Sequence, residues 1–202
     1  MPGRPASGAS SGGAFAILGA AALAITATTA YAFATHGTGD QGIVLVTRHL
    51  ARLAFPLFIA AFTASALLEL APSAPTRWLV RNRRWIGLAF AMVMFAHLGA
   101  IFAVWSVRED EPHFGLDRVV GGLGYVFIAF MAATSNDGAV RALGRQRWSR
   151  LHRSGLYLLW FIFAVTYLGR VSEEPSFLLG LGVAFGALAL RIVAWRHRRA
   201  SA

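Results

Sequence analysis

The chain has 202 residues, of which 56% are hydrophobic and only 14% are charged, and its formal net charge at pH 7 is +10. This composition excludes an ordinary soluble domain, in which about a quarter of the residues are charged. The absence of cysteine excludes disulfides and cysteine-held metal or iron–sulfur centres. The positive charge flanks long apolar runs instead of forming one stripe, which favours a membrane protein and argues against nucleic acid as a partner.

Six apolar segments approach the length of about twenty residues that a membrane-spanning helix requires. In chain order they cover residues 14–34, 50–70, 85–105, 119–134, 154–168 and 177–190. The last three are short, and we expect their helices to continue into the flanking residues. We expect residues 1–13, rich in Gly, Ser and Pro, to form a disordered tail and residues 196–202 a basic cytoplasmic tail. The sequence thus predicts an all-α integral membrane protein, with a six-span bundle over residues 14–195.

The arginines predict the orientation of this bundle. Fourteen of the nineteen are Arg4 or lie within residues 77–84, 141–153 and 191–199. The alternate connections carry acids instead: Asp40, then four acids within residues 109–117, then Glu173 and Glu174. Because basic residues near span ends stay on the cytoplasmic side, both termini are predicted to face the cytoplasm.

His97 is an ionisable residue inside the third predicted span, and such residues are functional candidates by default. It follows Arg84 by thirteen residues, which places it about 20 Å along a helix from the cytoplasmic boundary, in the outer half of the bilayer. A lone histidine in a span can also serve as a hydrogen-bonding partner in helix packing. His97 alone therefore leaves both interpretations open.

Two stretches resemble the ferric reductase-like transmembrane family. The first is residues 83–90 (RRWIGLAF) followed by His97, and it resembles the family's third span. The second comprises residues 134–137 (TSND), 141–144 (RALG) and 148–153 (WSRLHR), followed by Tyr157, and it is similar to the family's fourth loop and fifth span. The resemblance covers about residues 48–170. Within the family, the chain resembles in particular the haem-bearing membrane subunit of the bacterial methionine sulfoxide reductase system.

The resemblance implies a six-span protein that binds haem b and passes electrons across a bacterial inner (cytoplasmic) membrane. In two-haem members, the third and fifth spans each carry two histidines about fourteen residues apart. Fourteen residues make nearly four helical turns, so such histidines share one face about 21 Å apart. Here the position fourteen before His97 is Arg83, and the position fourteen after His152 is Thr166. The resemblance therefore implies one or two haems whose iron is ligated by His97 and His152, with incomplete ligation, because arginine stays protonated and threonine is a poor ligand.

Four further residues are candidates for the haem sites. His49, at the outer start of the second span, is a possible substitute ligand for the iron, but a histidine beside arginines can also be a simple interfacial residue. Arg150 and Arg153 are suited to haem propionates, although the orientation of the chain explains them equally well. Gly155 lies one turn from His152 and would leave room for a flat macrocycle.

Two functions remain open. The first is an oxidoreductase component that moves electrons from a separate donor, a flavin reductase or a quinol, to a periplasmic or extracellular acceptor. No predicted connection is long enough to hold a flavin or nicotinamide domain. The alternative is a haem-free or ligand-poor scaffold or binding subunit of the same fold, which the missing histidines favour. A transporter is a weaker third interpretation, because the sequence shows no convincing internal repeat or acidic proton relay.

Overall fold

The computed structural model describes residues 11–107 and 116–201, and every regular element in those two ranges is an α-helix. The helices are α1 (Ser11–His36), α2 (Asp40–Leu70), α3 (Ala74–Val107), α4 (Leu116–Ala133), α5 (Asp137–Leu143), α6 (Arg145–Arg170) and α7 (Phe177–Ala200). The acids at positions 109–111, which support the predicted orientation, lie outside the described residues.

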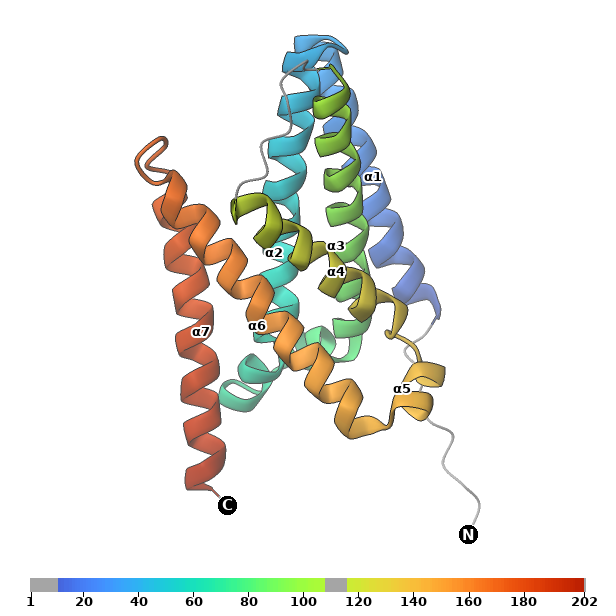
Figure 1. The fold of residues 1–202 in the computed structure, drawn as a ribbon. Helices are drawn as coiled ribbons and strands as arrows, with labels where there is room; N and C mark the ends of the chain where they lie inside the picture. The colour runs from blue at the N-terminus through green and yellow to red at the C-terminus, as the bar shows by residue number, and fades with distance from the viewer. Residues whose placement is uncertain (1–10, 108–115, 202) are drawn as a thin grey trace.

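The long helices run up and down and form one bundle (Figure 1). Helices α1, α2 and α3 pack together, α7 packs on α2 and α6, and α4 packs on α3 and α6. In Figure 1 the α2–α3 connection, α5 and the last turn of α7 lie at one end of the bundle, which we call the α5 end. The α1–α2 and α6–α7 connections lie toward the other end. This alternation is the one expected for antiparallel neighbours joined by short loops.

Five helices in the described chain, α1, α2, α3, α6 and α7, are long and apolar enough to cross a membrane. The fourth predicted span corresponds to α4, which has only 18 residues and is followed by α5 after a bend of 102°. Counting that bent pair as one span makes six. The predicted all-α bundle is therefore confirmed, while the direction in which its ends face remains a prediction from the arginines.

Several helices extend beyond the predicted spans. Helix α1 begins at Ser11 and α7 continues to Ala200, so residues 11–13 and 196–200, which the sequence predicts as tails, are helical. Helix α6 begins at Arg145, nine residues before the predicted start, and includes the basic segment that precedes the apolar run. Charged residues do not interrupt a helix; they only end the part that lipid can cover.

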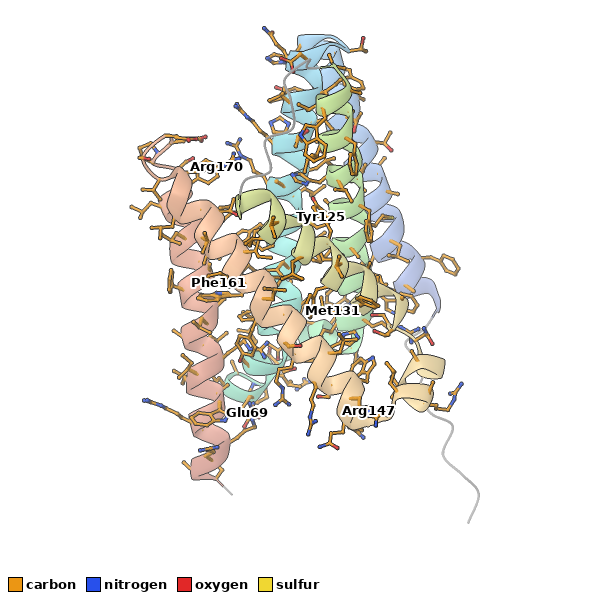
Figure 2. The ribbon with its side chains drawn as sticks, in the orientation of Figure 1. Glu69, Tyr125, Met131, Arg147, Phe161 and Arg170 are labelled. Atoms are coloured by element: carbon orange, nitrogen blue, oxygen red, sulfur yellow. The ribbon has the colours of Figure 1, made fainter. Side chains whose placement is uncertain are left out.

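Aromatic side chains at the centre of the bundle join α2, α3 and α6. Phe58 of α2 is 1% exposed, and its ring centroid lies 5.7 Å from that of Phe90 and 5.1 Å from that of Phe163. On α6, Gly155 packs against Met131 of α4, and a Cβ atom at position 155 would lie 2.5 Å from the Met131 sulfur. Figure 2 shows Met131 on α4 between α3 and α6. These contacts hold the middle of α6 against the bundle, and a cavity lies on the α5 side of them.

Candidate functional site

The cavity has a volume of about 1050 Å³ and lies at the α5 end of the bundle, between α2, α3, α4, α5, α6 and α7. Sites for small molecules and cofactors usually measure about 300–1,000 Å³, so this space is large enough for one. The apolar part of its lining comes mainly from the bundle core, including Phe58 and Phe90. Its basic and imidazole side chains are Arg83, Arg84, His152, Arg153, Arg191 and Arg198, and Asp137 is the acid among its described lining residues.

The chain between α4 and α6 brings His152 to this cavity. Asn136 caps α5, because its side-chain oxygen accepts a hydrogen bond from the Ala139 amide at 2.8 Å. Gly144, with φ of 76°, then makes the turn from α5 into α6, a backbone conformation that favours glycine. Trp148, in the first turn of α6, donates from Nε1 to the Thr134 carbonyl at 2.9 Å. The sequence between α4 and α6 thus fixes the direction in which α6 leaves the turn.

His152 has two close neighbours in this arrangement. Its ring stacks on Trp148 with centroids 4.2 Å apart, and its Nε2 lies 3.0 Å from the Thr134 hydroxyl oxygen. That hydroxyl donates to the Phe130 carbonyl at 2.6 Å, so it is available to histidine as an acceptor. Nε2 of His152 is then the protonated donor and Nδ1 carries the lone pair. Coordination of a metal through Nε2 would require His152 to release Thr134.

His97 lies elsewhere, on α3 toward the other end of the bundle, and is not among the residues that line the cavity. Its Nδ1 is 2.5 Å from the Tyr125 hydroxyl of α4, and the two rings stack with centroids 6.4 Å apart. Within the described residues, Nε2 of His97 has no hydrogen-bonding partner. A metal-ligating histidine typically has one nitrogen held by a neighbouring polar group and the other free for the metal, and His97 meets this condition.

The resemblance pairs His152 with position 83 and His97 with position 166, and in this chain these positions are Arg83 and Thr166. Arg83 lines the same cavity as His152, and its charge acts on that imidazole. The charge that acts on His97 comes from Arg170, near the end of α6. Thr166, one turn earlier, is exposed on α6. The structure therefore places Arg83 near His152, and it places a basic residue near His97.

His49 is half-buried on α2, and its ring stacks on Tyr31 of α1 with centroids 6.0 Å apart. No hydrogen bond or ring contact between described residues joins it to His97. Nearby, Arg52 pairs with Glu174 of the α6–α7 connection at 3.2 Å. The structure thus gives His49 an aromatic neighbour, and its role as a substitute ligand remains a prediction.

The remaining predicted residues divide between the cavity and the surface. Arg153 lines the cavity, whereas Arg150 is exposed in a shallow surface hollow at the start of α6. Met131 fills the space beside Gly155 that we expected a macrocycle to use. No group of three or more His, Asp or Glu side chains in the described chain is arranged to hold a metal ion.

Sequence reasoning missed Arg191, which it treated as part of the basic cytoplasmic flank. In the structure Arg191 lines the cavity and donates from Nη1 to the Phe62 carbonyl of α2 at 2.6 Å. Its guanidinium carbon also lies 4.4 Å and 4.9 Å from the ring centroids of Phe62 and Tyr157. One signal could have identified it: four apolar residues (IVAW) separate Arg191 from the terminal arginines, so it lies inside the last apolar run.

Comparisons with known proteins confirm the resemblance inferred from the sequence. The chain is 34% identical over 125 residues to the protein-methionine-sulfoxide reductase heme-binding subunit MsrQ of Caulobacter vibrioides, covering 58% of this chain and 56% of that protein. It is 33% identical over 135 residues to MsrQ of Bordetella pertussis, covering 61% and 63%, respectively. MsrQ of Azospira oryzae is 32% identical over 103 residues, covering 46% and 40%.

In each case the match spans less than two thirds of the relative's length. No protein-family model matches the chain, and no solved structure is significantly similar to it.

Proposed function

We propose that the protein is a b-type haem oxidoreductase component that moves electrons across the bilayer from a separate donor to an acceptor at the outer face. The observation that carries this proposal is the 1050 Å³ cavity, which places His152 beside basic side chains and an apolar wall. The similarity to proteins named as heme-binding subunits supports it. When bound, haem supplies the reversible one-electron chemistry of its iron.

At the α5 end, we propose His152 as the axial ligand. The donor set fits a haem, because an imidazole, an apolar lining and several arginines suit an iron, a macrocycle and two carboxylates, respectively. To coordinate through Nε2, His152 must exchange its Thr134 contact for the iron. We propose Arg153 as a further contact within the cavity and Arg150 as one at its surface.

Toward the other end, we propose His97 as the ligand of an outer haem. A hydrogen bond with the Tyr125 hydroxyl holds Nδ1 and so orients the ring, and Nε2 is the nitrogen that we propose for the iron. His49 is the proposed substitute for the missing partner. A haem at each level would let electrons cross most of the membrane in two steps.

The arginine pattern supports a bacterial inner membrane location with both termini in the cytoplasm. The donor, a flavin reductase or a quinol, would then approach the basic α5 end. The relatives are named as subunits of a protein-methionine-sulfoxide reductase, so we propose a reductase at the outer face as the acceptor.

The test is the reduced-minus-oxidised absorption spectrum of the purified protein with a haem count per chain, for the wild type, His97→Ala and His152→Ala. We expect b-type bands in the wild type and loss of one haem, or most of the single haem, in each variant. A wild type that binds no haem would support the scaffold function instead. That alternative is favoured by Arg83, which lies where the resemblance places a ligand, and by Met131, which fills the space beside Gly155.

A further inference from the structure

Two of the five cavity arginines differ from the other three. Arg84 pairs with Asp137 at 3.3 Å, Arg198 pairs with Glu69 at 3.7 Å, and Arg153 is exposed. Arg83 and Arg191 are half-buried, and no carboxylate in the described chain pairs with either. They are therefore two cationic side chains that line the cavity without an ion-pair partner among the described residues.

The protein contacts of these two side chains satisfy few of their donors. A guanidinium has five N–H groups. Arg83 donates from Nη1 to the Ser65 hydroxyl at 3.2 Å, and Arg191 donates from Nη1 to the Phe62 carbonyl at 2.6 Å. Both acceptors are neutral. Most of their N–H groups therefore have no protein acceptor within the described residues, and those that face the cavity can bind a ligand there.

The positions of the acceptors bring the two arginines to one side of the cavity. Phe62 and Ser65 are three residues apart on α2, so they lie on neighbouring turns of the same helix face. Arg83 reaches this patch from α3 and Arg191 reaches it from α7, so the two positive charges lie on the same side of the cavity. Like charges held together in a membrane-spanning bundle are unfavourable unless an anion joins them. The arrangement calls for a ligand with more than one negative oxygen.

We propose that Arg83 and Arg191 bind the propionate carboxylates of the haem that His152 ligates, and so fix the direction in which the haem enters the cavity. This inference rests on the proposed function, because it assumes haem at this site. Guanidinium groups bind carboxylates through two parallel N–H···O bonds, which gives direction as well as affinity. The proposal also assigns a role to Arg83, which stands at the position where the resemblance predicts a second histidine. Arg83 and Arg191, both on the α2 side of the cavity, would hold the propionates, and His152 of α6 would hold the iron.

The experiment compares haem with its dimethyl ester, in which both carboxylates are blocked. Full-length apoprotein in detergent is titrated with each compound, for the wild type, Arg83→Gln, Arg191→Gln and the double variant. The same titrations in a His97→Ala background measure the α5-end site alone. Arg147→Gln is the matched control, because Arg147 is a basic residue of α6 that does not line the cavity (Figure 2).

We expect the wild type and Arg147→Gln to bind haem about tenfold or more tightly than the ester, as charge-assisted hydrogen bonds imply. Each Arg→Gln change should weaken haem binding and leave ester binding unchanged, and the double variant should show no preference. Arg83→Lys and Arg191→Lys, which keep the charge, should retain part of the preference. The reduction potential of the bound haem should fall in the Gln variants, because a nearby positive charge favours the reduced iron.

Three outcomes would overturn the inference. Equal binding of haem and ester by the wild type would show that the carboxylates are not recognised, while haem binding itself would leave the proposed function intact. An equal fall in the affinity for haem and for the ester in the Gln variants would show that the arginines only support the fold. A lower thermal stability of the same variants would confirm that structural role. A wild type that takes up no haem would overturn both the inference and the proposed function.

Discussion

His97 and Tyr125 join α3 to α4 through a hydrogen bond between Nδ1 and the phenol oxygen, and within the described chain this bond leaves Nε2 of His97 without a partner. The pair is half-buried, and its rings stack with an interplanar angle of 21°. A histidine held at one nitrogen has lost most of its rotational freedom before any ligand arrives. Tyr125 is therefore a positioning residue for His97.

Replacing Tyr125 by Phe keeps the stacked ring and removes the hydroxyl that hydrogen-bonds Nδ1 of His97. Loss of such a supporting bond typically lowers metal affinity about 10- to 100-fold. We expect weaker haem binding at the outer level and a changed spectrum, with little change in the thermal stability of the apoprotein. Haem titration followed by absorption measures the effect. The His97→Ala variant is the reference in which the ligand itself is lost completely. Identical titrations for Tyr125→Phe and the wild type would exclude an orienting role.

Thr134→Val removes the hydroxyl that competes with iron for Nε2 of His152, while its volume stays similar. We expect haem affinity at the α5-end site to stay the same or rise, because the ligand no longer has to break a hydrogen bond. Thr134→Ser, which keeps the hydroxyl, is the matched control and should behave as the wild type. A clear drop in haem affinity for Thr134→Val alone would show that Thr134 orients His152 for coordination.

Arg83→His restores the histidine that the resemblance predicts near His152. Because Arg83 lines the same cavity as His152, we expect that an imidazole at this position would offer the iron a second nitrogen in place of a contact to the propionates. We expect the wild-type haem at this level to be partly high-spin and the variant to move toward a low-spin, six-coordinate state. Electron paramagnetic resonance and the Soret band report the spin state. A wild-type haem that is already fully low-spin would mean that another residue completes the coordination.

The orientation can be tested directly because the chain contains no cysteine. Glu173 lies in the α6–α7 connection and Gln146 in the first turn of α6, and both side chains are exposed. With both termini cytoplasmic, a membrane-impermeant thiol reagent should label the Glu173→Cys variant in intact cells and the Gln146→Cys variant only after lysis. Labelling of both variants in intact cells would contradict the six-span orientation.

Gly180→Ala tests the packing of α7 on α6. A Cβ atom at position 180 would overlap the Tyr167 ring, so one element has to shift. We expect a loss of about 1–3 kcal/mol in stability, as for other overpacked sites. Gly182→Ala on the same helix is the control, since no described atom lies within 4 Å of the equivalent Cβ position. Thermal unfolding in detergent measures both, and equal stabilities would indicate that the helices can separate slightly at no cost.

Much of this protein follows from local properties of the sequence. Apolar runs of sufficient length determine the spans, because lipid accepts only backbone whose hydrogen bonds are satisfied internally. Helical periodicity also places positions 83 and 97 on one face of α3, since fourteen residues make nearly whole turns. The two stretches quoted from residues 83–97 and 134–157 were sufficient to predict the resemblance to haem-bearing relatives, which the comparisons confirm. Each of these properties depends only on residues close together in the chain.

The tertiary structure decided which partners those residues meet. Arg191 lies in the cavity because its guanidinium packs on the rings of Phe62 of α2 and Tyr157 of α6. Gly155 packs against Met131 because α4 crosses α6 at that point. Packing between helices likewise brings Tyr125 to His97 and Thr134 to His152. Helix geometry is local, but the tilt and rotation of one helix against another depend on side chains far apart in sequence. The occupant of each site therefore depends on packing that periodicity alone does not specify.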